Sequence, residues 1–224
     1  MSYTVLFTAN KERQLGVSEV FNNAWLYGPF IYDVLWPKYG KHFSLTDEMR
    51  HKNDWEGLEK ELFSANNFED LCVYFSMGCG FFHIKDKEKV GNAIIGFANN
   101  NYFEDKDIKN RMIEVGNAMK NINDENAEVF GLCLNTISNY VADSFNTSYE
   151  TFLEHAKKEY PNDDEEFYEY YFCEMQDEFE GRKMFDDDMD YGPLLMIHID
   201  DDNNVSYEEL GEYYTREKNN NLQK

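Results

Sequence analysis

The stretch NDDEEFYEYYFCEMQDEFEG, residues 162–181, combines nine carboxylates with regularly spaced aromatic side chains. When its residues are placed 100° apart, the large apolar side chains gather in an arc of about 100°, the width of a core-facing stripe. These side chains are Tyr168, Tyr171, Phe172, Met175 and Phe179. The pattern predicts an amphipathic helix over residues 164–180 and is too rich in aromatics for a disordered acidic tail.

The opposite side of this predicted helix is acidic. Its carboxylates are Glu165, Glu166, Glu169, Asp177 and Glu180. Like charges four residues apart weaken a helix by about 0.2–0.5 kcal/mol per pair, so the arrangement does not serve the helix itself. A solvated surface explains it, and so does a rigid negative surface that imitates a phosphate backbone for a nucleic-acid-binding protein. Such a surface would be extended by Asp186, Asp187, Asp188 and the run 200–202.

The net charge of −23 is concentrated in one half of the chain. Residues 1–112 carry 13 Lys/Arg and 16 Asp/Glu, whereas residues 113–224 carry 8 and 28. A negative field repels nucleic acid and anionic membranes and attracts basic proteins and cations. Solubility explains a mild acidic excess better than it explains an excess confined to one half. We therefore expect a basic protein partner, with no direct binding to nucleic acid or to a membrane.

The composition favours a folded chain of long regular elements. Aromatic residues make up 17% of the 224 residues, and there are only 4 prolines and 13 glycines. Apolar periodicity predicts helices over residues 18–40 (split at Gly28-Pro29 and ended by Pro37), 54–65, 86–100 (capped by Asp86), 106–122, 125–145, 148–160 and 206–218. Strands are predicted over residues 2–9 and 193–199, and Gly78 and Gly80 indicate a turn between two further strands within 69–84.

These elements predict an α+β fold that is predominantly helical with a small sheet. The segment 125–145 is apolar around much of its circumference, which is typical of a buried central helix. We expect a single domain over residues 1–224. The uneven distribution of charge also allows a subdivision into a near-neutral α/β part (1–103) and an acidic helical part (104–224).

The segment 198–209 can be aligned with the ligand spacing of an EF-hand calcium loop. Asp200 and Asp202 take the third and fifth positions and Glu209 the twelfth, where calcium needs a bidentate ligand. However, the first position is histidine and the sixth is asparagine instead of glycine, and Gly192-Pro193 argues against an entering helix. Alternatively, Ser206 and Glu209 form the capping box of the last helix, preceded by a turn.

Sequence signals for catalysis are few. The five histidines are scattered, and the chain has no HExxH motif, no Cys/His metal spacing, no P-loop and no GxSxG. Asp33, His42 and His51 could line a pocket near Trp25 and Trp36, although aromatic helical hairpins more often form core. Two carboxylates suffice for glycosidic chemistry, but no pair stands out. We expect neither enzymatic activity nor a cofactor.

The cysteines and the N-terminus indicate a cytoplasmic protein without disulfides. All four cysteines lie among apolar residues, as reduced core thiols do: Cys72, Cys79, Cys133 and Cys173. The start MSYTVLFTAN has no basic region, and its apolar run is too short for a signal peptide. No stretch approaches the roughly 18 apolar residues of a membrane span.

The leading hypothesis is an acidic protein that binds and blocks a basic, nucleic-acid-handling partner by charge mimicry. Two settings fit it equally: a phage inhibitor of host defence, of the anti-restriction or anti-CRISPR type, and an immunity protein for a nuclease toxin. The alternative is a small-molecule or calcium-binding module that uses the loop at 198–209. A third possibility is a structural protein that is acidic only for solubility. The oligomeric state is left open.

Overall fold

A computed structural model describes residues 3–13, 15–22, 34–35, 37–39, 55–77, 80–133, 153, 157, 161–162, 166 and 194–221. Its centre is a six-stranded mixed sheet in the order β2-β1-β4-β3-β5-β6. The strands are β1 (Tyr3–Ala9), β2 (Leu15–Asn22), β3 (Gly80–His83), β4 (Val129–Cys133), β5 (Leu195–Ile199) and β6 (Val205–Glu209). Neighbouring strands are antiparallel except β3 and β5, which are parallel. Strands from both halves of the chain thus share one sheet.

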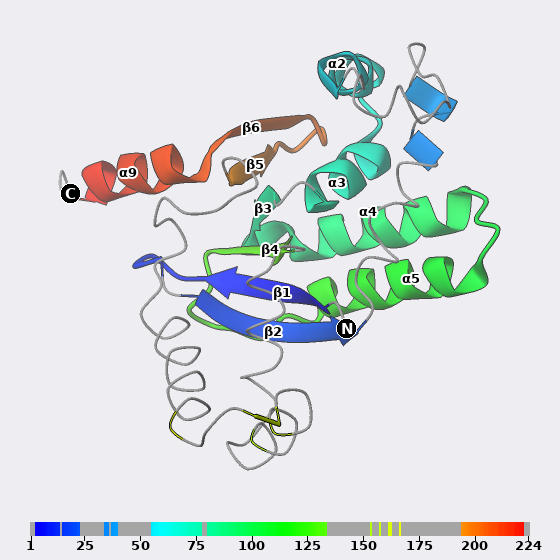
Figure 1. Ribbon diagram of the computed structural model, residues 1–224. Helices are drawn as coiled ribbons and strands as arrows, with labels where there is room; N and C mark the ends of the chain where they lie inside the picture. The colour runs from blue at the N-terminus through cyan, green and yellow to red at the C-terminus, as the bar shows by residue number, and fades with distance from the viewer. Residues whose placement is uncertain are drawn as a thin grey trace.

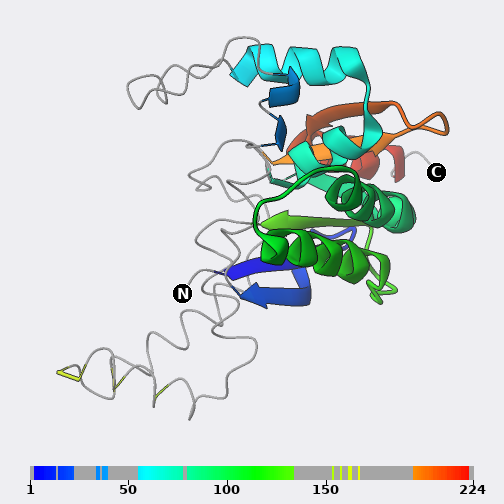
Figure 2. The ribbon, with the colours of Figure 1, turned by 90° about the vertical axis from the view of Figure 1, so that its right-hand side faces the viewer.

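Helices lie on both faces of this sheet. They are α2 (Trp55–Ala65), α3 (Phe68–Met77), α4 (Lys87–Asn100), α5 (Lys106–Lys120) and α9 (Leu210–Asn221), with a short 3-10 helix, η3 (Ile84–Asp86), before α4. Figures 1 and 2 show α4 and α5 side by side on one face, whereas α9 continues from β6 on the other. The two faces are therefore covered by different parts of the chain.

The larger part of the core lies between the sheet and helices α3, α4 and α5. Alternate strand residues point to this face because side chains of a strand alternate between its two sides. They include Phe82, Phe130, Leu132 and Ile197, all fully buried. The opposite face holds a smaller cluster, in which Phe7, Phe81, Val129 and Met196 pack against Leu210, Tyr213 and Tyr214 of α9.

Helices α4 and α5 approach each other closely at two glycines. A Cβ atom on Gly91 would lie 2.5 Å from the carbonyl oxygen of Gly116, and one on Gly116 would lie 2.7 Å from the carbonyl oxygen of Gly91. No real Cβ atom tolerates such a contact with backbone, so the pair sets how closely the two helices pack.

The α+β class and several predicted elements are confirmed. Strands occur within 2–9 and 193–199, and helices within 54–65, 86–100 and 106–122. The predicted apolar stripe of α5 is buried, at Ile108, Met112, Val115 and Met119. Asp86 occupies the N-cap position of α4, as predicted, but its side chain makes no capping hydrogen bond. Cys72 is a buried free thiol, as expected.

Other predicted elements are wrong, and at residues 18–22 and 129–133 pairing within the sheet overrides the local pattern. Residues 18–22 belong to β2, and residues 37–39 are helical, so Pro37 does not end the helical backbone. The segment 69–84 is a helix followed by one strand. The start of 125–145 is not a central helix but β4, the strand between β1 and β3. The sheet is accordingly larger than the small sheet predicted.

Several predictions fall outside the described residues. They include the helix over 164–180, of which Glu166 alone is described, and most of 148–160, where Leu153 and Lys157 have helical backbone. In the part of the chain that the structure describes, no helix combines the length and the apolar character needed to span a membrane.

Candidate functional site

Most of the predicted partner-binding residues lie outside the described ranges. Glu166 is the exception, and it is exposed on helical backbone. The others are Glu165, Glu169, Asp177, Glu180, Asp186, Asp187 and Asp188, and the pocket candidates Trp25, Asp33, Trp36, His42 and His51 are likewise outside. Among the described residues, the candidate surface is the β5–β6 hairpin with α9.

The tip of the hairpin is a fixed turn whose carboxylates face solvent. Asp200 Oδ1 accepts hydrogen bonds from the backbone N–H groups of Asp202 and Asn204 at 2.9 and 2.8 Å, and Oδ2 accepts one from the Asn204 side chain at 2.8 Å. Asn203 adopts the left-handed conformation (φ 62°), which asparagine tolerates. The Asn204 side-chain bond, followed by the backbone bonds, lowers the pKa of Asp200. The turn therefore fixes the Asp200 carboxylate and the backbone that carries Asp201 and Asp202.

The hairpin does not bring the proposed calcium ligands together. Asp200 and Asp202 lie at the tip, whereas Glu209 ends β6 opposite Leu195. A strand rises about 3.3 Å per residue, so Glu209 is roughly 13 Å along the strand from Val205. Ser206, predicted to cap the last helix, instead pairs with His198 within the hairpin. Among the described residues, no group of three or more His, Cys, Asp or Glu side chains is arranged to hold a metal ion.

Exposed carboxylates lie at both ends of β6, at the hairpin tip and at the start of α9. We refer to this set as the acidic edge, and it consists of Asp200, Asp201, Asp202, Glu209 and Glu212, all exposed. Its members belong to the hairpin tip, to the end of the last strand of the described sheet and to the first turn of a helix. Carboxylates in the first turn are favoured by the helix dipole, so the negative charge of Glu212 also suits the local structure.

A chain of polar side chains fastens the hairpin to α9 and to the sheet. His83 Nε2 lies 3.2 Å from His198 Nδ1, and His198 Nε2 lies 2.6 Å from Glu208 Oε1. Arg216 of α9 donates to both oxygens of Glu208, at 2.5 and 2.7 Å. Four elements, namely β3, β5, β6 and α9, are joined in this way.

The charges along this chain determine its proton positions. The Arg216 hydrogen bond lowers the pKa of Glu208, so Glu208 is ionised and can only accept. His198 therefore donates through Nε2–H, and in its neutral form accepts at Nδ1 from His83 Nε2–H. Burial lowers the pKa of His83 to about 4, with smaller contributions from His198 and Lys85, so His83 is neutral at pH 7.

This chain is best explained as a positioning device. Within the described residues, no hydroxyl or thiol nucleophile is hydrogen-bonded to either imidazole, and the ring of Tyr213 packs edge-on against His83 at 5.4 Å. Sequence reasoning missed it because His83 and His198 are 115 residues apart. The available signal was a histidine at position 198 within an otherwise apolar strand.

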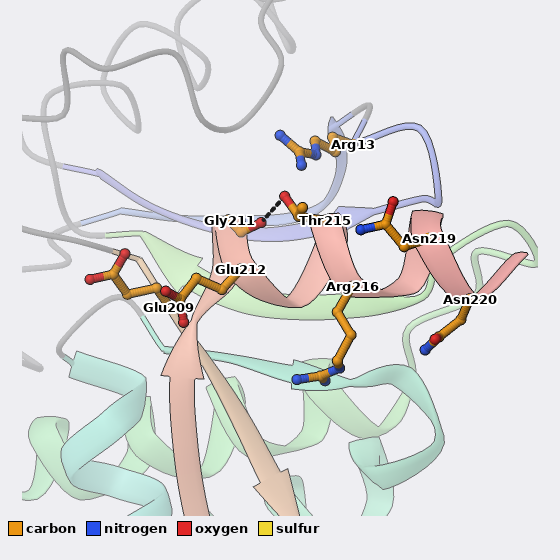
Figure 3. A pocket seen from close by; sticks show the side chains of 8 residues that line it. All are labelled: Arg13, Glu209, Gly211, Glu212, Thr215, Arg216, Asn219 and Asn220. Atoms are coloured by element: carbon orange, nitrogen blue, oxygen red, sulfur yellow. Dashed lines mark hydrogen bonds between the residues drawn. The ribbon is translucent and has the colours of Figure 1, made fainter. Parts of the chain in front are cut away.

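An open groove of about 680 Å³ runs beside α9, next to part of the acidic edge (Figure 3). It is lined by Arg13, Glu209, Gly211, Glu212, Thr215, Arg216, Asn219 and Asn220. Thr215 is bonded to the carbonyl of Gly211 at 2.9 Å, and the Arg13 guanidinium packs over the ring of Tyr214. Small-molecule pockets are mostly apolar and enclosed. The open, charged lining fits polar contacts with another macromolecule better.

A buried ion pair lies in the near-neutral first half of the chain. The carboxylate of Asp70, on α3, is almost completely buried and accepts from Lys38 Nζ at 3.0 and 3.2 Å and from the Tyr39 hydroxyl. Burial, and then this hydrogen bond, raise the pKa of Tyr39. The charge of Asp70 is thus paired and fully bonded, which is typical of a structural ion pair that fastens residues 37–39 to α3.

No protein-family model matches the chain, and neither the curated proteins nor the solved structures contain a significant match. Function therefore has to be argued from the geometry and charge of the surface itself.

Proposed function

We propose that this protein binds and blocks a basic, nucleic-acid-handling protein by presenting carboxylates where that partner normally meets phosphates. The observation that supports it is the acidic edge: five exposed carboxylates in a part of the chain whose overall charge is strongly negative. The positions are fixed by the hairpin turn and by the polar chain from His83 to Arg216. A backbone held in this way loses little conformational entropy on binding, which favours affinity.

The predicted acidic helix over 164–180 would enlarge this surface. A phosphate-binding partner recognises charge density before sequence, so several carboxylate patches can serve together. The negative field would also accelerate encounter with a positively charged partner. A phage inhibitor of host defence and an immunity protein for a nuclease toxin both remain consistent with this function, since they share the same electrostatic requirement.

The test compares two variants that remove the same number of charges. The edge variant carries Asp201→Asn, Asp202→Asn, Glu209→Gln and Glu212→Gln, and retains Asp200 because that carboxylate holds the turn. The control variant carries Glu12→Gln, Glu88→Gln, Glu104→Gln and Asp107→Asn, which are exposed positions elsewhere. A third variant replaces Glu165, Glu166, Glu169, Asp177 and Glu180 with glutamine.

Each variant is used to capture proteins from host lysate at 50 and 300 mM salt, and association is then measured with the purified partner. The edge variant should lose its partner while the control retains it. Association of the wild type should slow as salt rises, because exposed charges are screened over about 10 Å at 0.1 M. Nucleic acid should compete for the partner. If the edge and five-glutamine variants both capture the same proteins at the same salt as the control, the carboxylates are only a solvated surface.

A further inference from the structure

The outer edge of β6 carries unpaired backbone groups. Leu210 N–H donates to the Leu194 carbonyl and Asp200 N–H to the Asn204 carbonyl, which fixes the hydrogen-bonded pairs of this antiparallel hairpin. Because such pairs alternate, Ser206 and Glu208 are bonded to β5. The backbone N–H and C=O groups of the intervening residues point away from β5. These residues are Val205, Tyr207 and Glu209. The C=O of Glu209 precedes α9 and accepts a hydrogen bond from the first turn of that helix. Among the described residues, no strand pairs with the outward groups of Val205 and Tyr207 or with the N–H of Glu209.

Helix α2 lies beside this free edge and forms a groove with it. The groove has a volume of about 600 Å³ and is lined by Glu59, Lys60 and Phe63 of α2 and by Val205, Ser206 and Tyr207 of β6. The Tyr207 hydroxyl donates to Glu59 Oε1 at 2.6 Å, and its ring lies 5.8 Å from that of Phe63. Tyr207 is nevertheless 44% exposed, and among the described residues Tyr102 is the other exposed large aromatic. A strand edge, a flanking helix and exposed aromatic area thus occur together.

We propose that an extended basic segment of the partner adds to β6 as a seventh strand, between β6 and α2. This inference rests on the proposed function for the identity of the partner. Peptides commonly bind by strand addition, in which backbone hydrogen bonds give affinity and pockets beside the edge select side chains. The outward N–H and C=O groups of Tyr207 and the outward N–H of Glu209 would supply those bonds.

The side chains of the groove favour lysine or arginine in the added strand. Tyr207 and Glu209 point to the same side of β6, and Glu59 of α2 lies over Tyr207 on that side. A residue of the added strand opposite Glu209 would meet its carboxylate, whereas Lys60, which also lines the groove, offsets the charge of Glu59. The rings of Tyr207 and Phe63 offer apolar area for the long stem of such a side chain and a face for its charge. Opposite charges across neighbouring strands stabilise their pairing.

A second copy of this chain is a poor occupant of the same edge. Pairing β6 with another β6 would place a strand with two adjacent glutamates, next to three aspartates, against its own copy. Like charges directly across strands destabilise the pair, and each chain carries a net charge of −23. Charge complementarity therefore selects a basic segment of a different protein.

The test uses the full chain and a ten-residue peptide in which lysine alternates with threonine. Titration calorimetry should show binding with one peptide per chain. Amide hydrogen exchange should slow at least tenfold at Tyr207 and Glu209, with little change at Ser206 and Glu208, whose amides are already bonded to β5. Glu59→Gln should weaken binding about three- to tenfold, whereas Glu88→Gln, an exposed glutamate on α4, should not.

Two methylated peptides separate strand addition from simple charge attraction. One carries N-methyl groups on the lysine amides and the other on the threonine amides, so their charges are identical. Only one of these two sets faces β6, because outward amides alternate along a strand. One peptide should therefore bind at least tenfold more weakly than the other.

Equal binding of the two methylated peptides, or unchanged exchange at Tyr207 and Glu209, would overturn the inference. If the captured partner still depends on the acidic edge in that case, the proposed function stands and only the strand addition fails. If the peptide adds to β6 but the edge variant captures the same proteins as its control, the strand-addition site on β6 stands and the proposed function fails.

Discussion

The two faces of the sheet differ in how they are covered. On one face, α3, α4 and α5 form a mostly apolar layer in which Gly91 and Gly116 bring two helix backbones into contact. On the other face, α9 covers a smaller cluster and is joined to the sheet by an ionisable chain that includes His83, Glu208 and Arg216. The first face is held mainly by close apolar packing, with one buried ion pair at Asp70, whereas the second is held by a smaller cluster together with ionisable groups.

The largest expected effect is on the tightly packed face. Gly91→Ala places a Cβ atom 2.5 Å from the Gly116 carbonyl oxygen and 2.5 Å from Lys120 Cγ, and a backbone oxygen cannot move aside without separating α4 from α5. We expect the free energy of unfolding to fall by about 1–3 kcal/mol, as for other overpacked sites. Urea denaturation followed by circular dichroism measures this.

Gly211→Ala on α9 is the matched control for this substitution. Nothing lies within 4 Å of the Cβ position there, and alanine is the better helix former. Its free energy of unfolding should rise by about 0.4–1 kcal/mol. Effects of the same sign at the two glycines would show that the two faces do not differ in packing as inferred.

A smaller effect is expected from pH on the opposite face. Burial lowers the pKa of His83 to about 4, so the unfolded chain, with a histidine pKa near 6.5, binds the proton more tightly. The stabilisation is complete above about pH 6.5 and is lost as pH falls towards 4. The groups that face His83 are His198, Lys85, Glu208, Arg216 and Tyr213. We expect a loss of about 1–2 kcal/mol, below the full linkage value because His83 is partly exposed.

His83→Gln isolates this contribution because glutamine does not titrate. The quantity to compare is the difference in free energy of unfolding between wild type and variant at pH 7.5 and at pH 5, since carboxylates elsewhere titrate in both proteins. That difference should shrink, or shift in favour of the variant, at the lower pH. A difference that does not depend on pH would mean that His83 does not couple this face to protonation.

The smallest expected effect is that of calcium on the hairpin. Because Glu209 is far along the strand from Asp200 and Asp202, millimolar calcium should leave the melting temperature unchanged within error. A true site at 100 times its dissociation constant would add about 2.7 kcal/mol, which is easily seen. A rise of several degrees that Glu209→Gln abolishes would show that the second face has a stabilising ion after all.

Local pattern was a good guide where an element is amphipathic in isolation. The stripe from Ile108 to Met119 predicts α5 because burial on one side leaves a 3.6-residue period. It was a poor guide for β4, whose residues Val129, Phe130 and Leu132 are buried on both faces and so show neither helical nor alternating polarity. At β6, the Ser206–Glu209 spacing resembles a capping box, yet pairing with β5 makes the segment a strand.

The charge, its concentration in one half of the chain, the α+β class and amphipathic helices such as α4 and α5 follow from the sequence alone, because they depend on composition and on neighbours within a few turns. Only the tertiary structure decided the order of the strands, the chain from His83 through His198 to Arg216 and the groove between α2 and β6. Several of their contacts, such as His83–His198 and Glu59–Tyr207, join residues more than a hundred positions apart, and such contacts are selected by the packing of the whole sheet. No local periodicity in the sequence indicates these contacts.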